Sequence, residues 1–283
     1  MREVFRHLPY LLKRTLLSAL DDGCFGIAKG AAYSALLSFF PVLTSAATIL
    51  VQTRAEFVAR TMTQFLQQIV PPDSQEIVIN QFRVRGQRPF SLLIVAAVLS
   101  LWAASSVIKS LMEGFHAAYR TPRSRSFLHE SWVAISLVFL SAIPLVGASA
   151  LVLFGGQAER GILMALSVDP ILNPVAGLWE ALSRVARYSV AFGATATLTA
   201  MLYYFGPYRR QRWSRVWPGA ILATLLWLGA TSGFGWYIRN ITNYNVLYGS
   251  IGTGIALLVW MYVLSAIAIL GCEFNAEYER MLA

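Results

Sequence analysis

Residues 31–43 read AAYSALLSFFPVL and open a charge-free run that extends to residue 51. A helix needs roughly 20 apolar residues, at about 1.5 Å each, to cross a hydrocarbon core of about 30 Å. The run is long enough for this, yet it includes Tyr33, Ser34, Ser38 and Pro41. It therefore predicts a membrane-spanning helix that holds hydroxyl groups and a helix breaker at particular positions.

Long apolar runs recur along the rest of the chain. Of its 283 residues, 57% are hydrophobic and 13% are charged. Such a composition lies outside the range of soluble globular domains. A transmembrane barrel would show alternating segments of about 10 residues instead of continuous apolar runs. The sequence predicts an all-α polytopic membrane protein whose six transmembrane helices cover 31–51, 90–111, 132–155, 187–207, 216–238 and 246–271.

The segments between these spans complete a single membrane domain, 1–283. Residues 1–30 are predicted to form a cytoplasmic amphipathic segment, with a helix over 3–20 lying at the membrane interface. Residues 52–89 are predicted to form a small periplasmic helical pair. Residues 161–182 contain two proline breaks. These breaks favour an interfacial or re-entrant element, and a seventh crossing is the alternative.

The distribution of basic residues predicts the orientation. With both termini in the cytoplasm, the inner segments hold the larger share of the chain's 23 Lys and Arg. The positive-inside rule requires this arrangement. The net charge of +9 then serves orientation and attraction to anionic lipid headgroups rather than nucleic-acid binding. One short loop supplies the candidates for headgroup binding: Arg209, Arg210, Arg212 and Arg215.

The chain lacks the usual signatures of catalysis. Its three histidines show no metal-binding spacing, and no G-x-S-x-G motif surrounds a serine. Cys24 and Cys272 are predicted to be free cytoplasmic thiols near the same face. We therefore expect a non-enzymatic protein without a metal or cofactor.

Three groups of residues are candidates for a substrate path or polar groove. In the first span, Pro41 removes a backbone donor and leaves a carbonyl that needs a partner. In the second, two opposite charges four residues apart can pair on one helix face. In the last, polar residues mark both ends. The candidates are Tyr33, Ser34, Ser38, Pro41, Lys109, Glu113, Tyr248, Gly249, Glu273 and Asn275.

The stretch AAYSALLSFFPVL, the arginine loop running into WPGA, and YGSIGTGIALLVWMYVLSAIAILGCEFNAEYE together resemble the YihY/BrkB family of bacterial inner-membrane proteins, over about residues 25–280. This family was formerly labelled ribonuclease BN, but the histidine cluster expected for that activity is absent here. The resemblance implies lipid handling at the inner membrane, with delivery to a periplasmic lipid-carrier protein.

Three functions are consistent with these patterns. The first is the handling or translocation of an amphipathic molecule, most readily phospholipid, because no acidic residue lies deep in a span. The second is a secondary transporter or channel for a small solute, coupled through Glu273 or Glu113. The third is an envelope scaffold that binds partners through its periplasmic helices.

Overall fold

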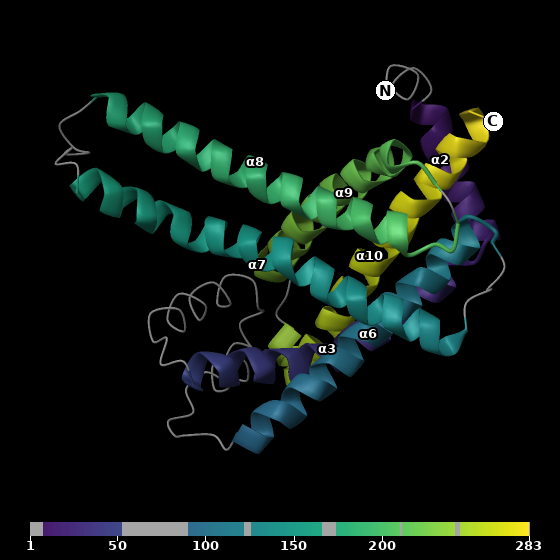
Figure 1. Cartoon of the computed structure of the whole chain (residues 1–283), viewed down its shortest axis with the longest axis horizontal. Helices are drawn as coiled ribbons and strands as arrows, with labels where there is room; N and C mark the ends of the chain where they lie inside the picture. Colours follow the sequence, from purple (N-terminus) through teal and green to yellow (C-terminus); the bar gives the residue numbers. More distant parts are fainter. Residues whose placement is uncertain are drawn as a thin grey trace.

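The computed structural model describes residues 8–52, 90–121, 126–165, 174–209, 211–240 and 244–282, and every regular element in these ranges is an α-helix. The all-helical prediction is therefore confirmed for this part of the chain. Figure 1 shows the helices, whose bounds are α2 (Leu8–Asp21), α3 (Cys24–Gln52), α6 (Phe90–Ala118), α7 (Phe127–Ala165), α8 (Pro174–Phe205), α9 (Trp213–Asn240) and α10 (Tyr244–Leu282).

Five of the described helices are long and apolar enough to cross a membrane, which makes this a multi-pass membrane protein. Their candidate spans are Cys24–Ala46, Ile94–Ala118, Phe127–Leu151, Trp213–Ile238 and Gly254–Leu282. The predicted span 187–207 lies largely within α8, which is not among the five and carries Glu180, Arg184 and Arg187 in its first half. The count of six spans therefore stays a prediction.

The junction between α2 and α3 lies closer to the N-terminus than predicted. Helix α3 begins at Cys24, so residues 24–30 belong to the same continuous helix as the first predicted span. The cause is Gly23, whose φ is 68°. This φ lies in the left-handed region, where a glycine commonly ends a helix. The chain turns there, and a new helix starts at Cys24.

Within the segment 161–182, residues 161–165 and 174–182 are described, and its predicted interfacial or re-entrant placement stays a prediction. Helix α7 continues to Ala165 and α8 already begins at Pro174, so both described parts are regular helix. Pro174 starts α8 instead of breaking it, because a proline at the first helical position has no hydrogen bond to lose. The predicted helical pair at 52–89 lies outside the described residues, apart from Gln52.

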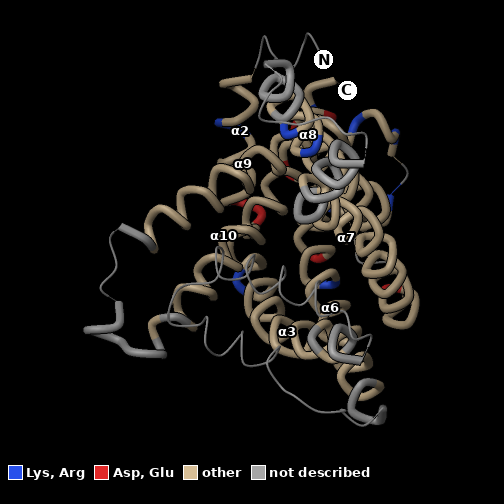
Figure 2. The backbone as a smooth tube through the Cα atoms, turned by 90° about the vertical axis from the view of Figure 1, so that its left-hand side faces the viewer, with Lys and Arg blue, Asp and Glu red and all other residues tan. Residues whose placement is uncertain are grey.

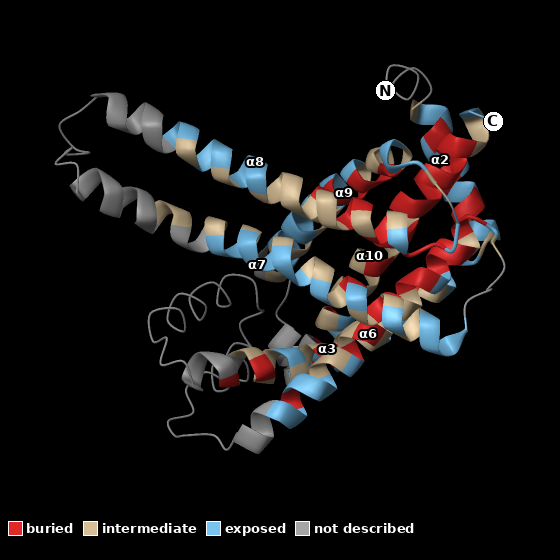
Figure 3. Ribbon diagram, in the orientation of Figure 1, coloured by how far each residue is buried: buried red, intermediate tan, exposed pale blue. Residues whose placement is uncertain are grey.

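Helix α10 is the central element of the bundle. It packs against α2, α3, α6 and α9, whereas α7 contacts α6 and α8. In the most apolar part of each span, 44% of the residues of α10 are buried, against 11% of the residues of α7 and of α9. Figure 3 shows the buried residues gathered where α2 lies beside the end of α10, while the α7–α8 hairpin is more exposed.

Helices α9 and α10 approach each other closely at two glycines. A Cβ atom added to Gly219 would collide with the carbonyl oxygen of Gly271, and one added to Gly271 would lie 2.8 Å from the carbonyl oxygen of Gly219. Ala220 and Ala223 are fully buried beside this crossing. Small residues permit such close packing of membrane helices, so the Trp-Pro-Gly-Ala and Gly-x-Glu-x-Asn motifs meet here.

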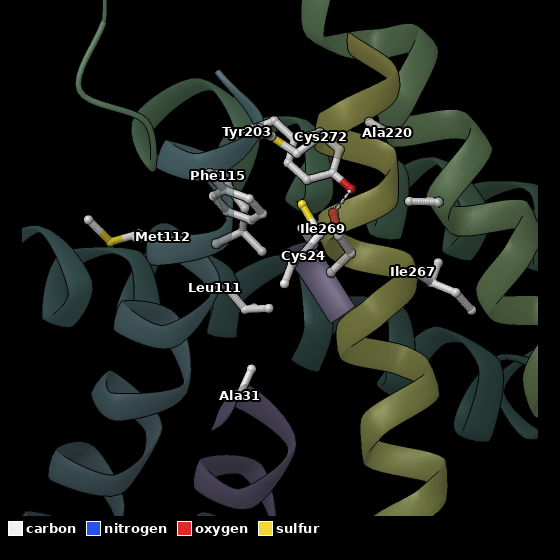
Figure 4. Close-up of a cluster of buried hydrophobic side chains, with 14 of the residues drawn as sticks. Cys24, Ala31, Leu111, Met112, Phe115, Tyr203, Ala220, Ile267, Ile269 and Cys272 are labelled. Carbon is white, nitrogen blue, oxygen red and sulfur yellow. Dashed lines mark hydrogen bonds between the residues drawn. The ribbon is translucent and has the colours of Figure 1, made fainter. Parts of the chain in front are cut away.

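Aromatic side chains connect α6 and α8 to the same region of α10. The rings of Phe115 and Tyr203 pack edge to face, with centroids 5.3 Å apart, a favoured geometry for aromatic pairs. The Tyr203 hydroxyl donates a 2.6 Å hydrogen bond to the carbonyl oxygen of Ala268, as Figure 4 shows. Cys24 and Cys272 are both buried free thiols in this core.

The glycine crossing yields a test with a control on the same helix. Gly219→Ala should lower the unfolding temperature of the purified protein in detergent, because the new methyl group collides with the backbone of α10. Gly233→Ala, also on α9, meets nothing within 4 Å and should leave stability unchanged or higher. Alanine favours helix over glycine by about 0.5–1 kcal/mol. Equal unfolding temperatures for the two variants would contradict this packing.

Candidate functional site at the clamped end of the bundle

The final turns of α10 bury three carboxylates. Glu273 has no exposed surface, and Glu277 and Glu279 are 2% and 7% exposed. A carboxylate removed from water is costly unless it is paired and hydrogen-bonded. Figure 2 shows several basic and acidic positions gathered around this end of the bundle.

Glu277 receives partners from α2 and from its own helix. The Ser18 hydroxyl donates a 2.8 Å hydrogen bond to Oε1 of Glu277, and Nε of Arg14 lies 2.6 Å from Oε2. Arg280, one turn along α10, also pairs with this carboxylate. Ser18 and Arg14 are four residues apart, so both project from adjoining turns of α2 towards α10.

Glu273 is held by Arg280 and by a thiol. Nη1 of Arg280 lies 3.3 Å from Oε1 of Glu273, and the Cys24 thiol donates a 3.8 Å hydrogen bond to Oε2. The other terminal nitrogen of Arg280 donates a 2.7 Å hydrogen bond to the carbonyl oxygen of Ala118, in the last turn of α6. One guanidinium thus caps α6 and pairs with two carboxylates of α10, and Arg14 supplies the second positive charge.

We call Arg14, Ser18, Glu273, Glu277 and Arg280 the ionic clamp. It joins α2, α6 and α10, and a second pair lies beside it. Nε of Arg120 donates hydrogen bonds of 3.1 and 3.2 Å to the two carboxylate oxygens of Asp22, at the α2–α3 corner. This pairing raises the pKa of Arg120, which therefore stays charged.

The loop between α8 and α9 is fastened to the same end of α10. Nη2 of Arg209 lies 2.5 Å from Oε2 of Glu279, and its guanidinium carbon lies 4.4 Å from the ring centre of Tyr119. Burial raises the pKa of the Tyr119 phenol, which therefore stays protonated. Gln211 donates a hydrogen bond to the carbonyl oxygen of Tyr203 near the end of α8.

Asn275 joins α10 to the start of α9 without any charge. The backbone N–H of Gly219 donates a 2.7 Å hydrogen bond to the side-chain oxygen of Asn275. The side-chain nitrogen donates a 2.9 Å hydrogen bond to the carbonyl oxygen of Val216. Both bonds are buried, and they join the Asn275 side chain to backbone groups in the first turns of α9.

The candidates of the first span do not converge on one site. The hydroxyl oxygens of Ser34 and Ser110 lie 3.4 Å apart across α3 and α6. The Ser38 hydroxyl donates to the carbonyl oxygen of Ala35 in its own helix, at 2.8 Å. Pro41 lies within the continuous helix α3, and Tyr33 is 60% exposed. Of these residues, Tyr33 faces away from the protein.

The remaining candidates lie apart from one another. The Lys109 ammonium lies 5.0 Å from the ring centre of Phe127 at the start of α7, and its pairing with the exposed Glu113 stays a prediction. Tyr248 and Gly249 fall in the first turns of α10.

The four candidate headgroup-binding arginines separate into different roles. Arg209 is committed to Glu279 and Tyr119, as described above. Arg210 lies outside the described residues. Arg212 is exposed and Arg215 is partly exposed, at the start of α9.

The residues predicted from the sequence do not include Arg14 and Arg280, the cations of the ionic clamp. For Arg280, the spacing of charged residues in the sequence could have indicated this role. Glu273, Glu277 and Arg280 recur at four- and three-residue steps along one face that continues an apolar span, so they can pair with one another. Among the described residues, no group of three or more His, Cys, Asp or Glu could hold a metal ion.

The fold and this site define a multi-pass α-helical membrane protein whose helix ends are fastened together by buried ion pairs. Comparison of the sequence with protein families identifies it further. The chain belongs to the family described as virulence factor BrkB, which matches residues 15–283. The expected membership of the YihY/BrkB family is thereby confirmed.

Individual relatives are distant. The chain is 26% identical to the ribonuclease-like protein YfkH of Bacillus subtilis, over 88% of each chain. It is 25% identical to a UPF0761 membrane protein of Alkalilimnicola ehrlichii and 24% identical to one of Tolumonas auensis. Those matches cover 90% and 88% of this chain, but 55% and 79% of the relatives. No solved structure matches the chain significantly.

The Asn275 bridge predicts a stability effect. Asn275→Asp keeps the side chain's shape but places a carboxylate oxygen against the Val216 carbonyl, which loses its donor. An unsatisfied buried polar group costs about 1–3 kcal/mol, more when charged, so the unfolding temperature in detergent should fall clearly. Lys13→Gln, at an exposed position, is the reference. If both variants unfold at the wild-type temperature, the bridge does not contribute to stability.

Proposed function

We propose that this protein binds phospholipid within the bacterial inner membrane and moves it between leaflets, or exposes it for removal towards the periplasm and cell envelope, without catalysis. The proposal includes an orientation with both termini in the cytoplasm, which rests on the distribution of Lys and Arg. The observation that carries the proposal is the separation of charge along the bundle. Glu273, Glu277 and Glu279 are locked into ion pairs at one end, and the middle of each candidate membrane span is charge-free.

The charge-free middles leave large apolar faces uncovered. On α3, Leu37 and Phe40 are 54% and 51% exposed; on α7, Ile143 and Val146 are 74% and 66% exposed. Figure 3 shows exposed positions along both the α3–α6 pair and the α7–α8 hairpin. In a bilayer these faces contact acyl chains, which favours an amphipathic substrate over a small polar solute.

Tyr33 supplies a polar group on such a face. Its side chain is 60% exposed on a helix that is a candidate span. In lipid a phenol hydroxyl needs a hydrogen-bond partner. Ser38 already has one in its own helix. A phospholipid headgroup or its ester carbonyls can provide the partner for Tyr33, so this residue is the best-placed contact of the first-span signature.

The start of α9 offers a basic rim for anionic headgroups. With Arg209 committed elsewhere, Arg212 and Arg215 lie near a helix N-terminus whose first turn has no acidic residue. The macrodipole adds positive potential there. Trp213 packs edge to face against Tyr204, with 5.3 Å between centroids. Tryptophan and tyrosine are enriched at the membrane–water interface, which fits this position.

A secondary transporter or channel is the alternative function. Its best coupling residue, Glu273, is fully buried and paired with Arg280, which gives the carboxylate a structural role. Proton- or sodium-dependent uptake that is lost in Glu273→Gln or Glu113→Gln would favour the transporter. An envelope scaffold, binding through residues 52–89, would instead lose function on deletion of that segment while its helices stay folded. A periplasmic lipid-carrier protein is the partner we propose for lipid delivery.

Lipid movement is directly measurable. The purified protein in vesicles with fluorescently labelled phospholipid should speed leaflet exchange, or extraction by an added carrier. Tyr33→Phe should slow it by about threefold, since a neutral hydrogen bond is worth about 0.5–1.5 kcal/mol. Tyr188→Phe, which alters an equally exposed tyrosine of α8, is the matched control. The proposal would be wrong if wild-type protein left the rates of leaflet exchange and of extraction at the level of protein-free vesicles.

The basic rim makes a prediction about lipid charge. Arg212→Gln with Arg215→Gln should reduce the exchange of labelled phosphatidylglycerol more than that of phosphatidylcholine, because only the former has net charge. Unfolding temperature should stay the same, since both side chains are accessible. Arg209→Gln should instead lower it by leaving the buried Glu279 unpaired. Equal losses for both lipids would remove the rim from the mechanism.

A further inference from the structure

Helix α2 is arranged with its small and polar residues towards the protein and its bulky apolar residues outward. The buried positions are Leu11, Thr15, Ser18 and Ala19. The outward positions are larger and more apolar, and between 36% and 63% of each side chain is exposed: Tyr10, Leu12, Leu16, Leu17 and Leu20. This is the reverse of a helix that packs a soluble domain.

The contacts on the inward face are largely polar. Ser18 and Arg14 bind Glu277, as described for the ionic clamp. Leu11 and Ala19 supply the apolar contacts: Leu11 is fully buried in a small cluster with Phe274 and Tyr278, and Ala19 is fully buried in the main core. Charge, hydrogen bonds and these two apolar residues therefore hold the inward face of α2, and its outward leucines are left exposed.

Chain connectivity places α2 at the membrane. Asp21 ends the helix, and the candidate span of α3 begins at Cys24, so the last turn of α2 lies at the bilayer surface. The Asp22–Arg120 pair fixes the corner between the two helices. The outward leucines thus lie next to lipid, on the side of the membrane that holds the end of α10.

The charges on α2 indicate which lipid. Lys13 is exposed and Arg14 has 47% of its side chain exposed even in its ion pair. The helix has no acidic residue before Asp21. Lys13 lies within the outward face, one turn before Leu16 and Leu17, and Arg14 lies at its edge. Basic residues on a helix at the membrane surface are attracted to anionic headgroups.

We infer that the outward face of α2 is a docking surface for anionic phospholipid in the leaflet on the side of the termini: its leucines enter the acyl boundary, Lys13 and Arg14 meet phosphates, and the lipid covers the ionic clamp. This inference does not depend on the protein transporting lipid. It assigns α2 a partner and explains why buried carboxylates are held by arginines that remain partly accessible from outside.

The test uses the full chain in nanodiscs that hold one copy each and leave both membrane faces accessible. Leu16→Cys, Leu20→Cys and Asp21→Cys are each labelled with a charged, membrane-impermeant maleimide. The native Cys24 and Cys272 are buried, so the unmodified chain supplies a low background. In water all three new thiols would be open, because all three positions are exposed in the folded chain.

With phosphatidylglycerol in the nanodisc, the two thiols on the leucine face should react about tenfold more slowly than that of Asp21→Cys. Pure phosphatidylcholine, or Lys13→Gln in the Leu16→Cys chain, should raise the labelling of Leu16→Cys. Similar rates for all three thiols would overturn lipid docking. Protection that is the same in both lipids and insensitive to Lys13→Gln would overturn the anionic preference. Neither result bears on the leaflet-exchange assay.

Discussion

The buried carboxylates at the end of α10 constrain the rest of the bundle. Glu273 and Glu277 have almost no exposed surface, so they require cations and donors within reach. Arg280 supplies one charge from the same helix, and Arg14 with Ser18 supplies the rest from a segment near the other end of the chain. The position of α2 follows from this requirement. The same guanidinium of Arg280 also caps α6, so the ends of three helices are positioned by one electrostatic network.

Close packing at glycines complements this charge network. Gly219 and Gly271 allow the backbones of α9 and α10 to come into direct contact, and Asn275 forms a hydrogen bond across this crossing. Helices in lipid gain no hydrophobic stabilisation from association, so tight contacts and hydrogen bonds must hold them. Gly219, Gly271 and Asn275 therefore hold α10 against α9. Tyr33 is exposed, and its contact with lipid is part of the proposed function.

The ion pairs and buried hydrogen bonds between helices gather at one end of the bundle. The middle of the described spans can stay free of charge and still be anchored, with apolar faces left uncovered by protein. The proposed cargo, with its long acyl chains, is compatible with such faces, and the inferred docking of α2 would extend the contact with lipid to the membrane surface. The basic start of α9 and the basic edge of α2 lie near the same end, where anionic headgroups are attracted.

The sequence by itself determined the membrane class, the all-helical fold and the approximate helix positions, because the length and hydropathy of a span depend only on neighbouring residues. It also placed Glu273 and Asn275 among the polar candidates. Their partners could not be predicted, because an ion pair such as Arg14 with Glu277 depends on which helices meet, and that information is not local. Nor could the sequence show that the Trp-Pro-Gly-Ala and Gly-x-Glu-x-Asn motifs touch each other. Only the tertiary structure decided this, since the fit of two helix backbones at Gly219 and Gly271 exists only once they are packed together.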